Sequence, residues 1–597
     1  MCQDNLTGGV SLNSKYLLGN EAIAYGLVEG NIEASFAYPG TPSSEITEKL
    51  IELSKIYGFY VEWSINEKVA YENAYGVSLT GRRAAVIMKH VGLNVASDAF
   101  ITSAYTGVIG GLVVLVADDP YAYSSQNEQD SRRYAVMGKI PAIEPSSVQE
   151  AKDMISFALS FSEKLGLPVM VRSVTRLSHS RADVVLKDIN YRKRETSFKK
   201  APEKLVMVPA NARVSLKVLN EKQKVIREYI EELPYNEAED THSEIGVIAA
   251  GISFQYVKEL KEKYNIPFAL FKVGSIPLPY KKLSSFIKNK KKLFVFEEGD
   301  PVVEEQIYII AKSVNPSLEI TGKMSGEVPA EGEMSIEIVD NILNKKATQR
   351  SFHPLPKRTP VLCPGCPHSG SFYILKKVFG KDAIFPGDIG CYTLGIQTGT
   401  IDTCLCMGAG IGTGSGITRF EKERPVVSII GDSTFFHAGI PELINASYNR
   451  ADQVIVILDN RTTAMTGHQP HPGVGITATG EKTIDIDIEK LALVCGADKV
   501  VFIDPYRIKN SIKKLKEVKN TKGLRVIIAK RPCIFVEKQT GIRFKVDKEK
   551  CKGCKVCLEI MCPAISFKEG KAEISVYCNG CGMCAEICPS GAIERDE

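Results

Sequence analysis

The sequence predicts an α/β fold in which three domains with parallel sheets precede a small α+β domain rich in cysteine. Short apolar runs alternate with helical patterns through most of the chain, and runs that are apolar on both faces are typical of strands in parallel sheets. Segments rich in proline and charge separate these stretches. At roughly 150 residues per domain, about four domains are expected for 597 residues.

The first domain is expected to span residues 1–188. Its clearest strands are Ala84–Met88 and Gly111–Val116, which are uninterrupted apolar runs. Residues 189–240 are charged and interrupted by prolines, which predicts a linker with one helix.

A second α/β domain is expected over residues 241–346. Ile245–Gly251 is predicted to be a strand entering a glycine turn, and Leu293–Glu298 a further strand. Proline-rich residues after 346 mark the next boundary, a third α/β domain is expected over 347–540, and the cysteine-rich tail spans 541–597.

The tail contains eight of the sixteen cysteines, in two matching runs of the form Cys-x2-Cys-x2-Cys closed by Cys-Pro. This spacing is typical of bacterial ferredoxins and predicts two [4Fe–4S] clusters. By the convention of that motif, each run gives its fourth cysteine to the other cluster. The predicted ligands are Cys551, Cys554, Cys557 and Cys588 for one cluster, and Cys578, Cys581, Cys584 and Cys562 for the other.

Zinc ribbons are the alternative, but the third cysteine of each run and the trailing prolines favour iron–sulfur. The first run departs from the motif, because four residues separate Cys557 from Cys562 where three are usual. The sequence therefore leaves two alternatives for the cluster that uses Cys562, one with three irons and one with four.

Composition argues against several classes of partner. The net charge of +5 is small, and the basic run Lys288–Lys292 has no interleaved aromatic residues, so no nucleic acid is expected. The longest uncharged stretch, 101–117, is too short for a membrane helix of ~20 apolar residues and is predicted to be a loop feeding a buried strand. No signal peptide is seen, and the cysteines, clustered after residue 360 except for Cys2, suit metal ligation in a reducing cytoplasm.

Two strands of the third α/β domain end in polar residues. One ends in Gly431-Asp432-Ser433, and Val454–Asn460 is the next strand, ending in Asp-Asn. Because ligands of open α/β sheets gather at the carboxyl ends of strands, we expect these tips to lie side by side. Asp432 and Asn460 carry oxygen donors suited to a Mg²⁺ ion that also binds phosphate. The alternative is an ordinary turn in which both residues act as caps.

The same segment resembles the Gly-Asp-Gly…Asn-Asn pattern of thiamine-diphosphate enzymes, with Ser433 in place of the last glycine and Asp459 in place of the first asparagine. The resemblance implies that Gly431, Asp432, Ser433, Asn460 and Thr462 bind the cofactor. It also implies Mg²⁺ ligation by Asp432, Asn460 and the carbonyl of Thr462.

Trp63–Ala70 resembles the Asn-Glu entry to a helix in the pyrimidine-binding domain of these enzymes, where a glutamate activates the cofactor through its aminopyrimidine ring. Glu67 is therefore the candidate catalytic carboxylate. The alternative is a glutamate favoured in a first helical turn by the helix dipole.

Three further motifs carry a closer resemblance. Tyr38-Pro-Gly-Thr-Pro-Ser-Ser44 resembles a signature of 2-oxoacid:ferredoxin oxidoreductases, and Met88–Asn94 with Ser124–Asp130 narrows it to the large (alpha) subunits of the indolepyruvate ferredoxin oxidoreductase family. That family implies a pyrimidine-binding domain (1–188), a transketolase-C-terminal-like domain (241–346), a diphosphate-binding domain (347–540) and a two-cluster ferredoxin domain (541–597).

The resemblance implies further site residues. Thr41 would contact substrate or cofactor, although it could be a turn residue braced by prolines, and His437 could reach the substrate or be structural. A third cluster is implied at Cys363, Cys366, Cys391 and Cys533, the alternative being buried structural cysteines. Cys404, Cys406 and Cys495 are predicted to be core residues, and His468 and His471 lie in a Gly/Pro-rich loop that could cover the site.

The implied reaction is oxidative decarboxylation of an arylpyruvate with coenzyme A and external ferredoxin, on thiamine diphosphate and Mg²⁺. The family's remaining catalytic domain, associated with a small beta subunit, is absent from this sequence, so an α2β2 assembly is expected. Rivals are another 2-oxoacid:ferredoxin oxidoreductase, a non-oxidative thiamine decarboxylase and a non-catalytic electron-transfer scaffold.

Overall fold

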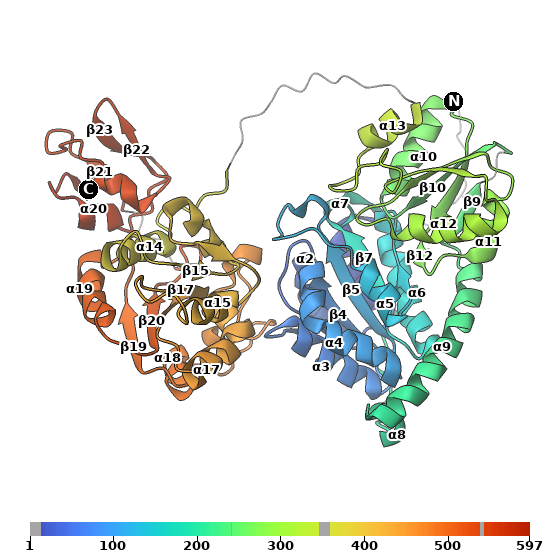
Figure 1. Ribbon diagram of the computed structural model, residues 1–597, viewed down its shortest axis with the longest axis horizontal. Helices are drawn as coiled ribbons and strands as arrows, with labels where there is room; N and C mark the ends of the chain where they lie inside the picture. Colours follow the sequence, from blue (N-terminus) through green and yellow to red (C-terminus); the bar gives the residue numbers. More distant parts are fainter. Residues whose placement is uncertain (1–13, 240–241, 345–358, 538–541, 597) are drawn as a thin grey trace, which may run out of the picture. The chain divides into compact units, whose positions relative to one another are not determined.

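The computed structural model describes residues 14–239, 242–344, 359–537 and 542–596. The chain divides into two compact units, residues 1–352 and 353–597, each of which is described separately (Figure 1). The domain boundaries predicted at residues 240, 346 and 540 fall outside the described residues or at their edge.

The main sheet of the first unit has the strand order β12-β6-β7-β5-β4-β2-β3. Its pairs are parallel except for β12 with β6. The strands are β12 (Ser275–Ile276), β6 (Ala142–Ile143), β7 (Val169–Val174), β5 (Leu112–Asp118), β4 (Ala84–Lys89), β2 (Ala34–Ala37) and β3 (Tyr60–Trp63). Every residue of β5 is buried, as expected for a parallel strand covered on both faces.

Helices cover this sheet and share its apolar core. Helix α1 packs against α6 and α2, and α3 packs against α4. Their bounds are α1 (Gly19–Glu29), α2 (Ser44–Tyr57), α3 (Glu67–Leu79), α4 (His90–Thr106), α5 (Arg132–Gly138), α6 (Val148–Leu165) and α7 (Thr175–His179). The strands β1 (Ser14–Leu18) and β8 (Arg181–Val185) are far apart in sequence and pair antiparallel in a separate two-stranded sheet.

The predicted linker contains α8 (Pro202–Leu205) and the long helix α9 (Pro209–Glu232), which buries one narrow stripe formed by Leu219, Ile226 and Ile230. A second sheet follows in the order β14-β13-β10-β11-β9. Its strands are β14 (Glu319–Thr321), β13 (Lys292–Phe296), β10 (Ile245–Ala250), β11 (Ala269–Val273) and β9 (Glu237–Glu239), and its helices are α10 (Ser253–Tyr264), α11 (Tyr280–Ile287), α12 (Val302–Val314) and α13 (Ile336–Asn344).

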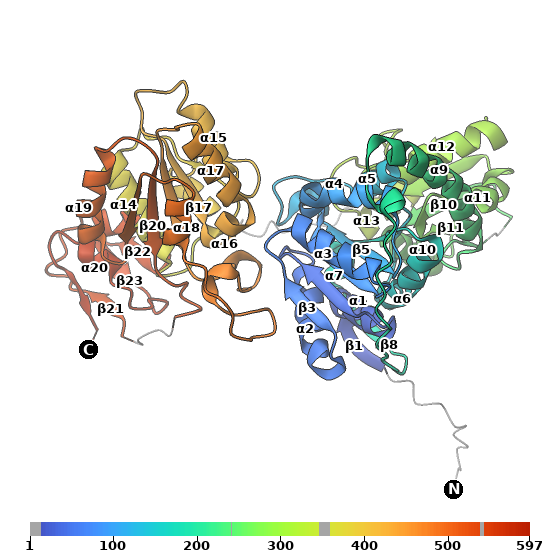
Figure 2. The same cartoon turned by 90° about the horizontal axis from the view of Figure 1, so that it is seen from below.

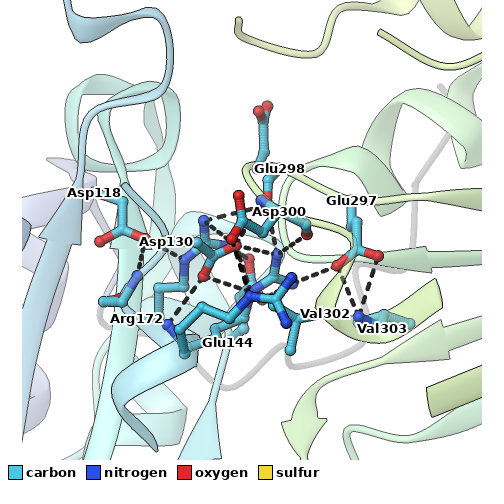
Figure 3. Close-up of polar contacts among 12 residues, drawn as sticks. Asp118, Asp130, Glu144, Arg172, Glu297, Glu298, Asp300, Val302 and Val303 are labelled. Carbon is cyan, nitrogen blue, oxygen red and sulfur yellow. Dashed lines mark hydrogen bonds and ion pairs between the residues drawn. The ribbon is translucent and has the colours of Figure 1, made fainter. Parts of the chain in front are cut away.

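Buried ion pairs join the two sheets of the first unit (Figure 3). Arg172 on β7 contacts Asp118 and Glu144, each at 2.6 Å. Arg132 contacts Glu297, which follows β13, at 2.9 Å, and donates to the Glu298 carbonyl at 2.6 Å. Since an unpaired buried charge is costly, these contacts hold the second sheet in one position against the first.

The second unit is a three-layer sandwich (Figure 2). Its sheet has the order β17-β18-β20-β19, all parallel, with β17 (Val427–Gly431), β18 (Val454–Asp459), β20 (Arg525–Lys530) and β19 (Lys499–Ile503). Alternate strand residues face two separate cores. One core is shared with α14 (Pro367–Phe379) and α19 (Ile508–Lys519), and the other with α15 (Ala409–Ile417), α17 (Ile440–Tyr448) and α18 (Ile488–Val494).

The cysteine-rich tail folds into the hairpin β22 (Ile565–Lys568)–β23 (Lys571–Ile574), the pair β21 (Phe544–Val546)–β24 (Ile593–Arg595), the turn η6 (Val556–Ile560) and α20 (Met583–Ile587). The predicted fold class is confirmed: parallel-sheet domains of the α/β class are followed by a small α+β domain.

Two local predictions were wrong. The stretch predicted as a loop before β5 begins inside α4, which runs to Thr106. Cys404 and Cys406 are exposed rather than in the core, and Cys495 is half-buried, because Cys404 ends β16 (Thr403–Cys404), Cys406 lies in the loop after it and Cys495 directly follows α18. In the described part of the chain, no helix is both long and apolar enough to cross a membrane.

Candidate functional site

Glu67 is the first residue of α3 and is buried. Asn66 caps this helix, its side chain accepting the N–H of Val69 at 2.9 Å, so the sequence starts the helix at the glutamate. The carboxylate of Glu67 lies against Gly92 of α4, where a Cβ would come within 2.7 Å of Oε1. Only glycine leaves room for the carboxylate in this position.

Thr41 lies near the same edge of the sheet, in the loop after β2. The hydroxyl of Ser124, in the segment after β5, donates to the Thr41 carbonyl at 3.3 Å. The side chain of Lys89, the last residue of β4, passes close to Gly40. The carboxyl ends of β2, β4 and β5 thus bring Thr41, Ser124 and Lys89 together, where ligands of open parallel sheets bind.

In the second unit, the tips of β17 and β18 lie side by side as expected, since the two strands are paired in parallel. Asp432 is buried and accepts three hydrogen bonds, from the Ser433 N–H at 2.8 Å, the Arg461 N–H at 2.7 Å and His471 Nε2 at 3.1 Å. Burial opposes ionisation, but His471 and the backbone N–H groups hold the pKa of Asp432 below its usual range.

His471 has a defined tautomer. Its Nδ1 accepts the N–H of Gly473 at 3.1 Å, so Nε2 carries the proton and donates to Asp432. The sequence placed His471 only in a loop that could cover the site. Its contact with Asp432, 39 residues away, could not be found from spacing.

The surroundings of Asp432 fit a divalent cation. Burial and the neighbouring Asp432 carboxylate raise the pKa of Asp459 to about 6. Asp459 Oδ1 and Thr462 Oγ1 are buried without a hydrogen-bond partner, while Asn460 Oδ1 accepts the Thr462 N–H at 3.2 Å. A carboxylate oxygen of Asp459 without a hydrogen-bond partner, next to the ionised Asp432, is the donor chemistry that Mg²⁺ prefers.

Gly431 is required by its neighbour Tyr392, since a Cβ at Gly431 would lie 2.6 Å from Tyr392 Cε1. The Tyr392 hydroxyl donates to the buried Asp388 and to Thr434 Oγ1 at 3.2 Å, and Asp388 also accepts the Gly408 N–H at 2.6 Å. This hydrogen-bond network holds the residues that follow β17 in place. His437 is buried on η3 (Phe435–Gly439), a π-helical turn just after it.

Cys363, Cys366, Cys391 and Cys533 line one cavity of about 110 Å³, together with His368 and Asn460. Burial raises the pKa of Cys366, and charge on Cys391, Cys363 and Cys533 raises it further, so the four thiols are close to one another. Burial and charge on Cys533 and Cys363 raise the pKa of Cys391 to about 11. Within the described residues no three His, Cys, Asp or Glu side chains could hold a single metal ion, whereas these thiols surround a space.

His368 lines this cavity and lies near enough to Asp432 to be affected by its charge. It is fully buried near the start of α14, its ring meets that of Tyr392 edge-on at 6.0 Å, and burial lowers its pKa to about 4 although Asp432 opposes the shift. The imidazole that His368 presents to the thiol cavity is therefore neutral. The sequence motif Cys363–His368 includes this histidine, but nothing in its spacing indicated a role for it.

The tail cysteines form two groups. The pKa of Cys557 is raised first by burial and then by charge on its neighbours Cys554, Cys588 and Cys551. The pKa of Cys584 is likewise raised by burial and then by charge on Cys581, Cys562 and Cys578. The structure thus brings Cys588 to the first run and Cys562 to the second. The extra residue before Cys562 is taken up by Met561, whose φ of 56° turns the chain back.

The Cys-Pro-Gly-Cys loop reaches the second group of tail cysteines. The Gly365 N–H donates to the sulfur of Cys562, and its carbonyl accepts the Tyr506 hydroxyl at 2.6 Å. Gly365 also lines the small cavity bounded by Cys562, Cys578, Cys581 and Cys584. Gly365 and Tyr506 therefore link the Cys363 group to the Cys562 group.

Three protein families match separate stretches of the chain. Residues 25–245 match the pyruvate flavodoxin/ferredoxin oxidoreductase family, thiamine diphosphate-binding. Residues 388–529 match the C-terminal TPP binding domain of thiamine pyrophosphate enzymes, and residues 576–594 match the 4Fe-4S binding domain.

Curated relatives align over nearly the whole chain. The chain is 42% identical to an indolepyruvate oxidoreductase subunit IorA from Archaeoglobus fulgidus, over 97% of each chain. It is 43% identical to the IorA subunit from Pyrococcus horikoshii, over 97% of this chain and 96% of the relative. The chain belongs to the IorA family. Like other IorA proteins, it is an oxidoreductase subunit that combines thiamine-diphosphate-enzyme domains with a 4Fe–4S ferredoxin-type domain.

Among solved structures, this IorA family member is also similar to a 2-oxoglutarate:ferredoxin oxidoreductase from Magnetococcus marinus, at 16% identity and a TM-score of 0.46 over 56% of this chain and 65% of that one.

Proposed function

We propose that the chain is the catalytic large subunit of an arylpyruvate:ferredoxin oxidoreductase acting in aromatic amino-acid catabolism. The proposed reaction is indolepyruvate + CoA + 2 oxidised ferredoxin giving indoleacetyl-CoA + CO2 + 2 reduced ferredoxin. The observation that carries the proposal is the identity of more than 40% along the full chain to indolepyruvate oxidoreductase subunits. We propose that the chain forms an α2β2 assembly with a small beta subunit, and that this enzyme acts in the cytoplasm.

The cofactor assignments rest on the residues of each unit. Asp432, Asn460 and the Thr462 carbonyl would ligate Mg²⁺, with Gly431 and Ser433 lining the diphosphate. Glu67 would hydrogen-bond the aminopyrimidine ring and hold the proton that must move there. Thr41 and His437 would face the substrate. When bound, thiamine diphosphate supplies the nucleophile for the 2-oxo carbon and accepts the electron pair as CO2 leaves.

The residues of the second unit support a path for single electrons. We assign Cys363, Cys366, Cys391 and Cys533 to a [4Fe–4S] cluster next to the strand tips. The Cys562, Cys578, Cys581 and Cys584 group would hold the next cluster, since Gly365, which lies between Cys363 and Cys366 in the chain, also lines the cavity of that group. The Cys551, Cys554, Cys557 and Cys588 group would be last. Cys554 is exposed, which suits electron exit to ferredoxin.

The activity test is an anaerobic assay of the chain with its small subunit, thiamine diphosphate, Mg²⁺ and coenzyme A. Viologen reduction that requires both indolepyruvate and coenzyme A is the expected result. Release of an aldehyde without dye reduction would indicate a decarboxylase, and activity with a different 2-oxoacid alone would overturn the substrate. Glu67→Gln is expected to abolish turnover, and full activity in that variant would remove Glu67 from the mechanism.

The cluster test is the content of iron and labile sulfide per chain after anaerobic purification. We expect about twelve irons for three cubane clusters, whereas about eight would argue against the Cys363 cluster. Cys366→Ser should lower the iron content while leaving the tail clusters visible by electron paramagnetic resonance.

A further inference from the structure

Lys89 ends β4 and is partly buried at the carboxyl edge of the main sheet in the first unit. Its aliphatic stem passes Gly40, where a Cβ would lie 3.1 Å from Lys89 Cδ. Its ammonium donates to the backbone carbonyl of Ser124 at 3.0 Å. The side chain is therefore held between the loop of Thr41 and the segment after β5.

This ammonium forms no ion pair among the described residues, unlike other buried cations of the same unit. Lys152, for example, contacts Glu29 at 2.8 Å, and Arg172 contacts Asp118 at 2.6 Å. Burial lowers the pKa of Lys89 to about 8, and Asp119 and Glu67 only oppose that shift from longer range.

The nearby carboxylates have other partners or another task. Asp119 accepts the Ser124 N–H at 2.8 Å, the Ser125 hydroxyl at 2.7 Å and the Thr175 hydroxyl at 2.8 Å. Glu67 is assigned to the pyrimidine ring. A lysine has three N–H donors, and a single carbonyl contact leaves it able to bind an anion from a ligand.

We propose that Lys89 binds the carboxylate of the 2-oxoacid substrate and so determines specificity for acids. The inference rests on the proposed function and deepens it. Lys89 lies on the side of Glu67 and Thr41, whereas the diphosphate is assigned to the strand tips of the other unit. Glu67 is assigned to the activation of the cofactor that reacts with the 2-oxoacid, so the substrate's carboxylate is the anion that we assign to Lys89.

The charge on that carboxylate is lost as neutral CO2 forms. Lys89 therefore stabilises bound substrate at least as much as the transition state of decarboxylation, and its removal should raise KM without lowering kcat. A charge-assisted hydrogen bond of this kind corresponds to an increase in KM of about 10- to 100-fold.

The experiment uses the complex of the chain with its small subunit and compares wild type, Lys89→Met, Lys89→Arg and the exposed control Lys55→Met. KM and kcat are measured for the 2-oxoacid that the wild type oxidises best and for coenzyme A. Inhibition by a 3-arylpropionate is compared with inhibition by its uncharged amide. If the wild type does not oxidise arylpyruvates but oxidises another 2-oxoacid, the proposed substrate is wrong. The role of Lys89 is then tested with that acid, because every 2-oxoacid has the carboxylate.

We expect Lys89→Met to raise KM for the 2-oxoacid and to abolish the preference for the arylpropionate over its amide, with Lys89→Arg intermediate. KM for coenzyme A and the affinity for thiamine diphosphate should match those of Lys55→Met. The proposal is overturned if KM for coenzyme A rises instead, or if kcat falls at unchanged KM, which would place Lys89 in cofactor activation. Unchanged discrimination between acid and amide in a folded variant would also overturn it.

Discussion

At the scale of single residues, the glycine facing Glu67 sets the position of the carboxylate. A Cβ at Gly92 would lie 2.7 Å from both Oε1 and Cγ of Glu67, and the glutamate cannot retreat far because it is buried at the start of α3. Gly92→Ala is therefore expected to displace the carboxylate and to lower kcat about 100-fold, since misplacement of a catalytic group by ~1 Å costs about that much. Steady-state kinetics with saturating thiamine diphosphate provide the measurement.

The control for Gly92→Ala is Gly76→Ala on α3, where a Cβ meets nothing within 4 Å. Alanine there should raise helix stability by about 0.5–1 kcal/mol and leave kcat unchanged. Equal activity of the two variants would show that the Glu67 carboxylate does not depend on Gly92.

Residue types at the strand tips could be predicted, whereas their partners could not. Asp432 and Asn460 follow two apolar runs, and the strand-end rule for parallel sheets brought them together. His471 and Tyr392 reach the same tips from loops and turns whose paths are set by packing rather than by periodicity. In the sequence, Lys89 was only part of a motif and no role was predicted for it, because its lack of a carboxylate partner follows from the fold.

At the scale of elements, the junction between the two sheets of the first unit depends on Arg132. It is fully buried on α5 and contacts Asp130 at 2.5 Å and Glu297 at 2.9 Å. Arg132→Met leaves these buried carboxylates without their cation, so we expect a loss of about 3–5 kcal/mol in the free energy of unfolding, read as a lower Tm.

The effect of Arg132→Met should depend on pH. Burial raises the pKa of Glu297 to about 7 even with Arg132 present, and removal of the cation raises it further. A carboxyl whose folded pKa is raised favours the folded state at low pH, and this contribution is lost as pH rises through that pKa. Below about pH 7 this loss is the same in both proteins, so the deficit in Tm should grow only as pH rises above about 7, where Glu297 ionises in the wild type but stays protonated in the variant.

Arg133→Met is the matched control, because its ion pairs with Asp300 and Glu305 are exposed. Exposed pairs contribute about 0–1 kcal/mol, so Tm should change little at any pH. A similar loss in both variants would mean that the buried network does not hold the two sheets together. Periodicity predicted β4, β5, β10 and β13 of these sheets, but the pairing of β12 with β6, which are far apart in sequence, was not predicted.

At the scale of the whole molecule, the order of the cysteine groups follows from contacts that the motifs do not encode. The spacing of the runs predicted two groups in the tail, and the structure brings together the same cysteines. The spacing of the cysteines could not indicate which of the two groups faces the Cys-Pro-Gly-Cys loop, because that depends on how the tail packs on α14 and α19. Gly365, Tyr506 and Asn579 make that contact.

The contact at Gly365 predicts that a small substitution there will slow electron transfer without removing a cluster. Gly365 has a φ of +73°, and a Cβ would lie 2.1 Å from Asn579 Oδ1. Gly365→Ala is expected to push the Cys578–Cys584 segment away and to weaken the N–H bond to Cys562. Iron content should stay at the wild-type level, while the rate of ferredoxin reduction falls severalfold in single-turnover measurements.

Two further variants separate this effect from general strain. Gly380→Ala, also at positive φ but with nothing within 4 Å of its Cβ, carries the backbone cost without touching the tail and should reduce ferredoxin at the wild-type rate. Adding Asn579→Ala to Gly365→Ala removes the clash and should restore much of the lost rate. If Gly365→Ala itself reduces ferredoxin as fast as the wild type, electrons do not pass between the Cys363 and Cys562 groups at this contact, and the proposed order of the clusters is wrong.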